Sequence, residues 1–531
     1  MLLAVFFSVV LIRIVFYFNP LKEPQNITVL IAETLSIAIY ALILVLVWCL
    51  ITRKLDKAKV IKVVTEKKFL ITFFIVLILA QVGFATQISM PLKLQCHTIG
   101  DREICLWDFN MVTTGAIDSV SAPISQPVID YLHKCQNNIP VFVMLRGAFK
   151  LAAAAGITNF QAVGTALNIL AINSALLILY FIARKLWGVR KAILSLFIAV
   201  SVLPLVLLYV PVFYTDTLSL PFVVGMFYLY LKLRDSKSKK RYLALLISMM
   251  LVAIIGVLIK FNAAIMLIAI VIDMFIRHDK AHSLKQALVS LAVIISLVTP
   301  VLVGYSTLSD QYIHNRATPG HITMPPTHYI MMGLGGKNGQ FNGYDDDSTY
   351  THSSRDKAIQ YNINEIKERL KVRGWSLPEF FYDKIVGTWG RPWLEARDRL
   401  NNNGLTTDEF RPSSLQRMIV GSKRYPLTPS NFIKAAYILI VIAFIISCAR
   451  SVALAKKQPT DLCTIYLAVF GLASFLLIWE ASPRYIINYF PFMILLATPA
   501  IYNLSPRAID KIKTSYLSIR HKFLKRWFKQ S

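Results

Sequence analysis

Two carboxylates stand where their side chains could carry out acid–base chemistry. Asp108 lies in CLWDFNMVTTGAID, directly after Trp107, and Asp216 lies in VPVFYTDTLSLPF. One carboxylate can accept the proton of an attacking hydroxyl while a second positions that hydroxyl. Both residues also fit a simpler role, because an aspartate at the start of a helix caps it, and the local sequence around Asp216 favours that role.

Three basic residues are candidates for binding a phosphate. Arg484 in WEASPRY, Lys260 in LIKFNAA and Arg146 in IPVFVMLRGAFK lie beside strongly apolar segments. A positive charge there is costly unless it faces a cavity or an anion. Two of them have alternative explanations: Arg484 follows Glu480 by four residues and could pair with it, and Arg146 could extend toward the membrane surface.

The Pro-rich segment TPGHITMPPTHYIMMGL holds further candidates for contacting a substrate. Its prolines argue against a regular helix. His328 could donate a hydrogen bond to a sugar or a phosphate, whereas we expect His321 to be solvated. We expect Tyr329, with Met331 and Met332, to form an apolar lid.

Two other groups of residues have simple interpretations. Asp345, Asp346 and Asp347 are consecutive, so they cannot all face one ion, and we expect an exposed turn there and no metal site. No cofactor is expected and no ligand spacing indicates zinc, while metal dependence stays open. Trp389 and Trp393 are predicted to anchor the chain at a membrane interface, although stacking on a sugar ring would require the same residue type.

These residues belong to a chain with the composition of a membrane protein. Apolar residues make up 56% of its 531 residues and charged residues 16%, against about a quarter charged in soluble proteins. The net charge of +28 does not indicate nucleic-acid binding, because the basic excess sits in short segments between apolar runs. The composition predicts an all-α protein whose main solvent is lipid.

The apolar runs predict about twelve transmembrane helices. They lie near residues 2–18, 29–51, 69–89, 162–184, 191–211, 216–233, 242–259, 261–277, 285–306, 432–449, 462–480 and 485–503. With this count, every basic segment falls on one side, which predicts a multi-pass protein of the cell membrane with both termini in the cytoplasm. Asp108, Asp216 and Arg484 then share the outer face. A change of one span between the two aspartates would separate them.

The spans divide the chain into five parts: a two-helix addition with a basic linker (1–68), a membrane core (69–306) with a first outer loop (90–160), a second extracellular loop (307–431), the last transmembrane helices (432–503) and a basic tail (504–531). Both long loops contain amphipathic stretches. Cys96, Cys105 and Cys135 share the first loop. A Cys96–Cys105 disulfide would close a short hairpin there, but the odd third cysteine leaves the pairing open.

A family resemblance rests on six segments in this order: LWDFN, KCQNNIPVFVMLRG, FYTDTLSLPF, TPGHITMPPTHYIMMGL, GQFNGYDDD and WEASPRYIINYFPF. From about Phe69 to Ala500 the chain resembles the GT-C fold membrane glycosyltransferases that use polyprenyl-phosphate sugars, in particular uncharacterised members from Gram-positive bacteria related to protein mannosyltransferases and aminoarabinose transferases. The resemblance implies that Asp108 is the catalytic base and Asp216 a second active-site acid. Protein mannosyltransferases carry an adjacent acidic pair near the position of Trp107, and the single acid here argues against a protein acceptor.

The resemblance also implies a reaction. The enzyme would move a sugar from an undecaprenyl-phosphate carrier to a cell-envelope acceptor, such as a polysaccharide or teichoic acid, at the outer face of the membrane and with inversion. The expected partners are the lipid-linked donor, the glycan acceptor and the bilayer. Arg484, Lys260, Arg146, His328 and Tyr329 would contact the donor. A lipid-linked sugar flippase or transporter, and a polysaccharide polymerase or ligase, remain the alternatives.

Overall fold

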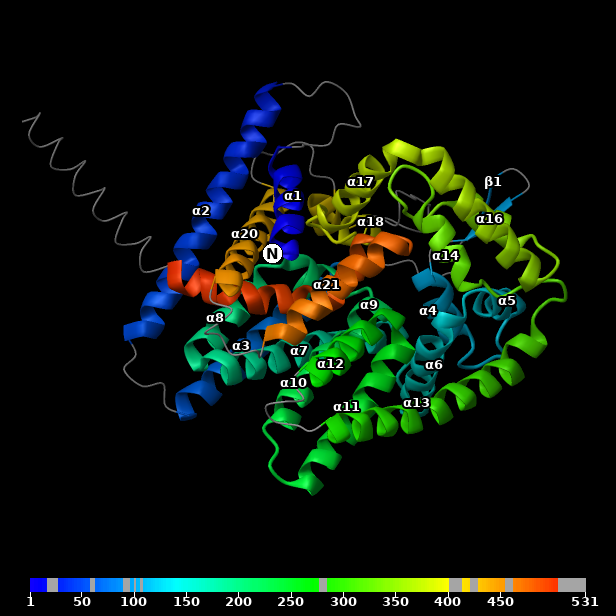
Figure 1. Cartoon of the computed structure of the whole chain (residues 1–531), viewed down its shortest axis with the longest axis horizontal. Helices are drawn as coiled ribbons and strands as arrows, with labels where there is room; N and C mark the ends of the chain where they lie inside the picture. Colours follow the sequence, from blue (N-terminus) through cyan, green and yellow to red (C-terminus); the bar gives the residue numbers. More distant parts are fainter. Residues whose placement is uncertain are drawn as a thin grey trace, which may run out of the picture.

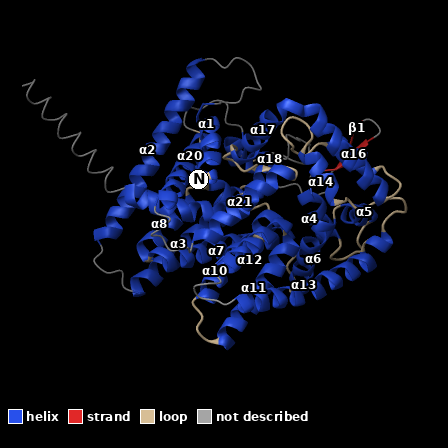
Figure 2. Cartoon of the chain, in the orientation of Figure 1, coloured by secondary structure: helices blue, strands red, loops and turns tan. Residues whose placement is uncertain are grey.

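The structure is a computed structural model that describes residues 1–16, 27–57, 63–88, 96–99, 102–105, 108–276, 284–400, 413–420, 428–453 and 462–504. Helices account for nearly all the regular structure within these ranges (Figure 2). Two four-residue strands form one antiparallel hairpin. The predicted all-α class is therefore confirmed, with this hairpin as a small addition.

The elements follow one another along the chain in five groups (Figure 1). The first group is α1 (Leu2–Phe16), α2 (Ile27–Lys57) and α3 (Val63–Ala85). The second is β1 (Cys96–Ile99), β2 (Arg102–Cys105), α4 (Asp108–Asp118), α5 (Gln126–Lys134) and α6 (Ile139–Ala154). The third is α7 (Phe160–Trp187), α8 (Val189–Val200), α9 (Thr215–Leu218), α10 (Leu220–Arg234), α11 (Lys239–Ile259), α12 (Ala264–Ile276) and α13 (Leu284–Tyr312).

The fourth group consists mostly of short helices. It contains α14 (Pro326–Gly333), α15 (Gly343–Tyr350), α16 (Arg355–Arg373), α17 (Leu377–Trp389), α18 (Ala396–Leu400) and α19 (Ser414–Val420). The last group is α20 (Pro429–Ala453), α21 (Cys463–Ile478) and the 3₁₀ segment η8 (Pro483–Tyr489), which continues as a helix to residue 504.

Seven described helices are long and apolar enough to cross a membrane: Ile31–Lys57, Val64–Ala85, Phe160–Trp187, Lys239–Ile259, Ser290–Arg316, Pro429–Ala453 and Pro483–Leu504. Shorter apolar helices cover Leu2–Ile12, Phe261–Ile276 and Cys463–Ile478. The predicted count of twelve is thus not confirmed. The spans expected at 191–211 and 216–233 correspond to α8 and α10, which have 12 and 15 residues and so reach only about 18 and 22 Å.

The break between α8 and α10 has a local cause. Pro204 begins a five-residue π-helical turn after α8, and a proline lacks the amide hydrogen that continuing the α-helix would require. The chain then reaches Tyr214 in an extended conformation before α9. This interruption turns the backbone inward and places Asp216 inside the helical bundle.

The central helices pack in a continuous series. α7 packs against α8 and α10, α10 packs against α11, and α12 packs against α21. α1 and α2 both pack on α20, where the rings of Phe7 and Phe444 lie 4.7 Å apart. The two N-terminal helices are therefore attached to the helix that follows the fourth group (Figure 1).

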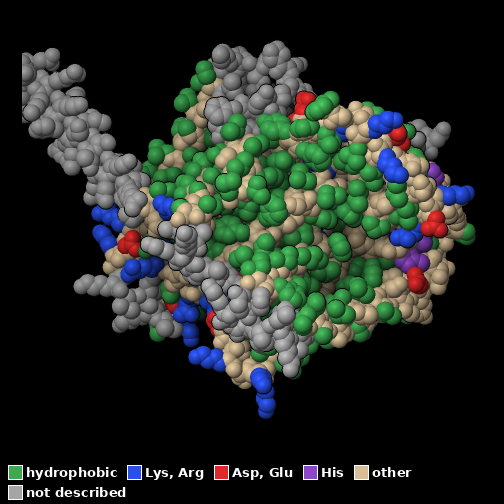
Figure 3. Space-filling view, in the orientation of Figure 1, with side chains coloured by type: hydrophobic (Ala, Val, Ile, Leu, Met, Phe, Trp, Pro, Cys, Tyr) green, Lys and Arg blue, Asp and Glu red, His purple; other side chains and the backbone are tan. Residues whose placement is uncertain are grey.

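The outside of this bundle is apolar. On α3, for example, Ile71, Ile75 and Leu79 are all more than half exposed, and their spacing of four residues places them on one face. Figure 3 shows hydrophobic side chains over most of the visible face, with charged side chains gathered toward its margins. An apolar outer surface of this extent is what lipid-facing helices require.

Trp389 does not anchor the chain at a membrane interface, contrary to the sequence-based prediction. Its side chain is buried, and its ring makes edge-to-face contacts with Phe6 and Phe7 at centroid distances of 5.6 and 5.2 Å. α1 therefore covers the end of α17. The nearby Trp393 donates a hydrogen bond to Ser430 Oγ over 3.2 Å.

Two local expectations between β1 and α14 have different outcomes. β1 and β2 pair with Cys96 opposite Cys105, which is the short hairpin that a disulfide between these residues would close.

The Pro-rich stretch, expected to be irregular, contains α14. Pro325 is its N-cap and Pro326 its first residue, positions where a missing amide hydrogen costs nothing.

We expect Trp389→Ala to lower the free energy of unfolding by about 3–5 kcal/mol, because it opens a cavity beneath α1. Thermal unfolding of the purified protein measures the change. Trp375→Ala is the matched control, since the Trp375 side chain is fully exposed, and it should leave the unfolding temperature unchanged. Equal effects of the two substitutions would contradict this packing.

Candidate active site

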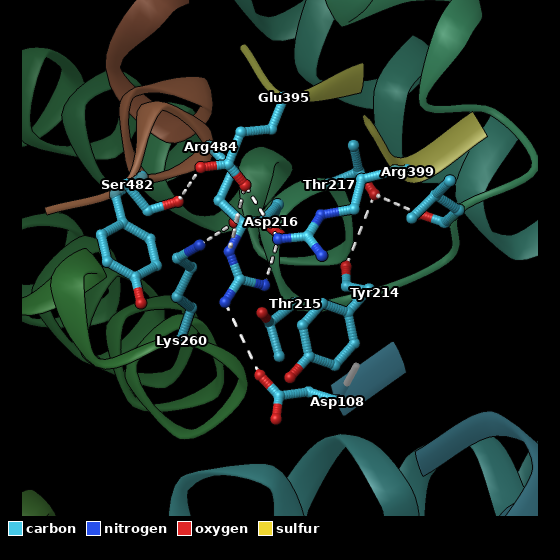
Figure 4. Close-up of polar contacts among 12 residues, drawn as sticks. Asp108, Tyr214, Thr215, Asp216, Thr217, Lys260, Glu395, Arg399, Ser482 and Arg484 are labelled. Carbon is cyan, nitrogen blue, oxygen red and sulfur yellow. Dashed lines mark hydrogen bonds and ion pairs between the residues drawn. The ribbon is translucent and has the colours of Figure 1, made fainter. Parts of the chain in front are cut away.

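Four charged residues singled out from the sequence meet in one cluster (Figure 4). Asp108 is the first residue of α4, and Asp216 lies in the first turn of α9. Lys260 follows the last residue of α11, and Arg484 is the second residue of η8. Each of the four comes from the end of a different element, so the tertiary fold alone brings them together.

Asp216 is a buried ion-pair partner and not a helix cap. The N-cap of α9 is Tyr214, and no side chain caps this helix. The Asp216 side chain is 1% exposed, and its Oδ1 accepts a hydrogen bond from Lys260 Nζ. A carboxylate removed from water in this way needs a partner charge, and Lys260, itself 9% exposed, supplies it.

Arg484 links the two aspartates. Its Nη2 lies 3.6 Å from Asp108 Oδ2, and its Nη1 lies 3.8 Å from Asp216 Oδ2. The guanidinium also lies over the ring of Tyr485, at 5.3 Å from the centroid. Because the Arg484 side chain is only 11% exposed, its charge is balanced mainly by these carboxylates and not by water.

Sequence reasoning missed a third carboxylate, that of Glu395. Its Oε2 lies 2.8 Å from Arg399 Nη2 and 4.0 Å from Arg484 Nε, and its Oε1 accepts a hydrogen bond of 2.6 Å from Ser482 Oγ. The spacing of four residues between Glu395 and Arg399 was a signal in the sequence. This signal is weak, because acid–base pairs at this spacing are common in polar segments.

The backbone at Glu395 is held in an unusual conformation. Glu395 and Leu394 have φ angles of +64° and +49°, a region that costs a non-glycine residue about 1–3 kcal/mol. The hydroxyl of Tyr209 donates a 2.6 Å hydrogen bond to the carbonyl of Leu394. This bond and the ion pairs of Glu395 maintain the conformation.

The cluster contains equal numbers of positive and negative charges. Its carboxylates are Asp108, Asp216 and Glu395, and its cations are Lys260, Arg399 and Arg484. A buried cluster is stable only if its charges compensate one another. A phosphate that binds here therefore competes with these carboxylates for the cations.

Asp108 is the carboxylate that a substrate can reach. Its side chain is 37% exposed, against 1% for Asp216. Asp108 Oδ1 accepts a 2.8 Å hydrogen bond from the Tyr131 hydroxyl, which itself accepts one of 2.6 Å from Asn138 Nδ2. Asn138 Oδ1 accepts a third, of 2.7 Å, from Tyr214. This chain of hydrogen bonds fixes the orientation of an accessible carboxylate.

Stacked aromatic rings form a second feature close to the cluster. The rings of Tyr329 and Trp479 are nearly parallel at 5.0 Å, and those of Trp479 and Phe475 lie 5.2 Å apart. Trp479 directly precedes Glu480, whose carboxylate accepts a hydrogen bond of 3.3 Å from Tyr485. Tyr329 thus belongs to an aromatic wall, whereas Met331 and Met332, expected in a lid, are buried.

A buried lysine holds this wall in place, and sequence reasoning missed it. Lys384 on α17 is 1% exposed and donates hydrogen bonds to the carbonyl oxygens of Leu477 and Trp479, at 2.9 and 2.8 Å, and to that of Gly333. It therefore ties α14 and α17 to the end of α21. The sequence FFYDKIVG gave no sign that this lysine would be buried.

Two of the predicted donor contacts lie elsewhere. Arg146 Nε donates hydrogen bonds to Ser119 O and Oγ, at 3.2 and 3.0 Å, just beyond the end of α4 opposite Asp108. His328 is buried, with its Nδ1 2.9 Å from Thr349 Oγ1. Burial lowers the pKa of His328 to about 4.

The three consecutive aspartates do not form an exposed turn, as the sequence had suggested. They lie in α15, where Asp345 is buried and forms two hydrogen bonds with Arg369, of 2.7 and 2.8 Å. Asp346 pairs with Lys134 of α5 over 2.6 Å. Within the described ranges, no three His, Cys, Asp or Glu side chains are grouped so that they could hold a metal ion.

We expect Lys260→Met to lower the free energy of unfolding by about 3–5 kcal/mol, because it removes the nearest countercharge of a buried carboxylate. Chemical denaturation of the purified protein measures the loss. Lys185→Met is the control, since Lys185 pairs with the largely exposed Asp235, and such pairs contribute only about 0–1 kcal/mol. Similar losses in both variants would contradict the burial of the Asp216–Lys260 pair.

Glu480 should make stability depend on pH. Burial raises the pKa of Glu480 from 4.5 to about 7, while Arg484 opposes the shift. A carboxyl group with a raised pKa favours the folded protein fully below pH 4.5, and this contribution is lost as the pH rises through about 7.

Between pH 5 and pH 8 the free energy of unfolding of the unsubstituted chain should fall by up to about 3 kcal/mol more than that of Glu480→Gln, because glutamine has no proton to lose. Unfolding temperatures of both proteins across this range measure the difference. If the two proteins show the same pH dependence, Glu480 ionises in the folded protein as it does in water.

Comparisons with known proteins place the chain in a family. The comparison with curated proteins gives no match. Among solved structures, the crystal structure of ArnT from Cupriavidus metallidurans bound to undecaprenyl phosphate is similar over 82% of this chain and 77% of its own, with a TM-score of 0.32 and 10% sequence identity. A family model matches residues 1–503, including the two helices before Phe69. The chain belongs to the family described as conserved hypothetical integral membrane protein.

Proposed function

We propose that this protein is a GT-C-type glycosyltransferase that transfers a sugar from a polyprenyl-phosphate carrier to a cell-envelope acceptor at the outer face of the membrane. The observation that supports this most is the unequal exposure of the two aspartates. Asp108 is open to a substrate, whereas Asp216 is buried against Lys260, and Arg484 contacts both. An accessible base beside a preorganised cation is what phosphate departure from a sugar requires.

In the proposed reaction, Asp108 accepts the proton of an acceptor hydroxyl. The hydroxyl oxygen forms a bond with the anomeric carbon, and the bond between that carbon and the phosphate oxygen breaks. The electron pair of the broken bond leaves with the polyprenyl phosphate. One displacement of this kind inverts the configuration of the sugar.

The charge balance of the cluster explains how phosphate departure could be stabilised. A phosphodiester gains one negative charge when it leaves as a phosphate monoester. At the same step Asp108 gains a proton, so its attraction for Arg484 is lost and the guanidinium is released toward the leaving phosphate. Arg484 is well suited to this role because a guanidinium can bind a carboxylate and a phosphate in the same geometry.

Asp216, Lys260 and Glu395 position Arg484 in this proposal and do not exchange protons with the substrate. Asp216 and Lys260 are nearly inaccessible, and Glu395 is 13% exposed. The aromatic wall of Tyr329 and Trp479 provides a flat surface of the kind on which a sugar ring or an isoprenoid chain packs. The apolar exterior of the helices gives the lipid portion of the donor access to the site from the bilayer.

We expect Asp108→Asn to abolish transfer, with at least a 100-fold loss of rate, because an amide cannot accept the proton. A deletion strain complemented with each variant tests this through mass spectrometry of its envelope polymers, which also identifies the missing sugar. Asp118→Asn is the matched control, since Asp118 is an exposed aspartate at the other end of α4, and it should restore the wild-type polymer. A normal polymer in the Asp108→Asn strain would refute the mechanism.

An assay with purified protein in proteoliposomes separates the remaining alternatives. Under our proposal, monophosphate-linked donors are consumed and polyprenyl phosphate is released, with no movement of free sugar across the bilayer. Sugar transport without release would indicate a transporter, and consumption of diphosphate-linked donors alone would indicate a polymerase or ligase.

The proposal also requires a specific orientation in the membrane. In a chain without its native cysteines, Trp375→Cys between α16 and α17 should react with a membrane-impermeant maleimide on intact cells. Ser238→Cys, before α11, should react only after permeabilisation. Both native side chains are exposed in the structure. The opposite labelling pattern would place the cluster on the cytoplasmic side and exclude the proposed outer-face reaction.

A further inference from the structure

A cavity lined by basic and aromatic side chains lies away from the cluster of Asp108 and Arg484. It is located where α7 and α10 end and where α8 and α11 begin, and its volume is about 530 Å³. α10 starts just after Asp216 and ends at Arg234, and α11 runs back to Lys260. Fifteen helical residues span about 22 Å, so the cavity and the cluster lie at opposite ends of these helices.

Four basic side chains line this cavity: Arg184, Lys185, Lys232 and Arg241. Two of them are neutralised, because Arg184 Nε lies 2.8 Å from a carboxylate oxygen of Glu66 and Lys185 pairs with Asp235. Lys232 and Arg241 form no ion pair with any described residue. The lining therefore carries two positive charges that no described carboxylate neutralises.

The lining of the cavity also contains an aromatic pair, Phe181 and Tyr228. The rings of Phe181 and Tyr228 are stacked, with centroids 6.1 Å apart and an angle of 25° between their planes. Lys232 Nζ lies 4.6 Å from the centroid of the Tyr228 ring, so a cation–π contact holds the ammonium group beside this aromatic pair. Gly188, which also lines the cavity, has a φ of +83°, a conformation that glycine adopts without strain where the chain turns into α8.

This combination fits an anion with an organic substituent. Uncompensated cations bind the anionic group, and stacked rings bind an apolar neighbour. Basic residues near a membrane often have a simpler role, in which they are solvated and orient the helices. That role requires neither a cavity nor cations that converge on one, whereas the residues here come from three separate helices.

We propose that this cavity binds a phosphate group, supplied either by an anionic phospholipid of the adjacent leaflet or by a soluble phosphate ester. Basic pockets between transmembrane helices are known to hold lipid phosphates. The site is independent of the glycosyl transfer proposed above, because it shares no residue with that cluster. Its ligand would bridge the ends of α10 and α11, the two helices that lead to Asp216 and Lys260.

Native mass spectrometry of the full-length protein tests the site. The protein is titrated with dioleoyl phosphatidylglycerol, with dioleoyl phosphatidylcholine and, separately, with inorganic phosphate and AMP. We compare the unsubstituted chain with Lys232→Gln/Arg241→Gln. The control is Lys239→Gln/Lys240→Gln, which removes the same charge from exposed positions at the start of α11 that do not line the cavity. Thermal unfolding shows whether each variant is folded.

We expect the unsubstituted chain and the control to bind one phosphate-bearing ligand at least tenfold more tightly than the Lys232→Gln/Arg241→Gln variant does. Selective retention of phosphatidylglycerol over phosphatidylcholine would identify a lipid phosphate, and retention of AMP or phosphate would identify a soluble ester. Equal binding by the two double variants would overturn the proposal, as would a failure of the unsubstituted chain to bind any of these ligands. If the Lys232→Gln/Arg241→Gln variant unfolds, Tyr228→Leu replaces it as the test. Tyr228→Leu keeps the charges and is expected to weaken binding, because it removes one ring of the Phe181–Tyr228 pair.

Discussion

The burial of Asp216 is the constraint on which the arrangement around the site depends. A carboxylate that is 1% exposed must be compensated inside the protein, and the compensating charges come from distant parts of the chain. Lys260 arrives at the end of α11 and Arg484 at the start of η8. Arg484 also forms ion pairs with Asp108 and Glu395. The interruption of the helix at Pro204 allows Asp216 to reach this position. The break in the predicted span 191–211 is therefore also what lets the site assemble.

The carboxylates of the cluster differ in exposure, and this difference is what suits the cluster to acid–base chemistry. Asp108 lies at the edge, is oriented by Tyr131 and keeps more than a third of its side chain exposed. The other side chains are two carboxylates and three cations, each at most 14% exposed, so ionised Asp108 supplies the third negative charge. A proton taken up by Asp108 therefore changes the net charge of the whole cluster by one, and Arg484 is the group best placed to pass that change to a bound phosphate. In the transfer that we propose, the cluster is neutral before the reaction and gains one positive charge when Asp108 takes up the proton.

The sequence predicted the parts of the site that stand out against apolar surroundings. Lys260 and Arg484 stand out because a charge beside a hydrophobic span requires a reason. The twelve-span topology, which is not confirmed, also predicts that Arg484 shares one membrane face with the two aspartates. Glu395 and Lys384 were missed because they lie in polar segments, where charges are ordinary and burial leaves no local pattern. Trp389 was misplaced for a related reason, since composition does not distinguish a tryptophan at a membrane interface from one packed beneath another helix. The twelve-span count exceeds the seven long apolar helices for two reasons: hydropathy does not reveal the break at Pro204, and three of the predicted spans are apolar helices of fewer than 18 residues.

A structure of the protein in lipid nanodiscs with bound undecaprenyl phosphate would test the central claim most directly. We expect density for the phosphate within hydrogen-bonding distance of Arg484, with the Arg484–Asp108 contact lengthened and the Asp216–Lys260 pair intact. A phosphate bound elsewhere, with the contacts of Arg484 to both aspartates unchanged, would contradict it.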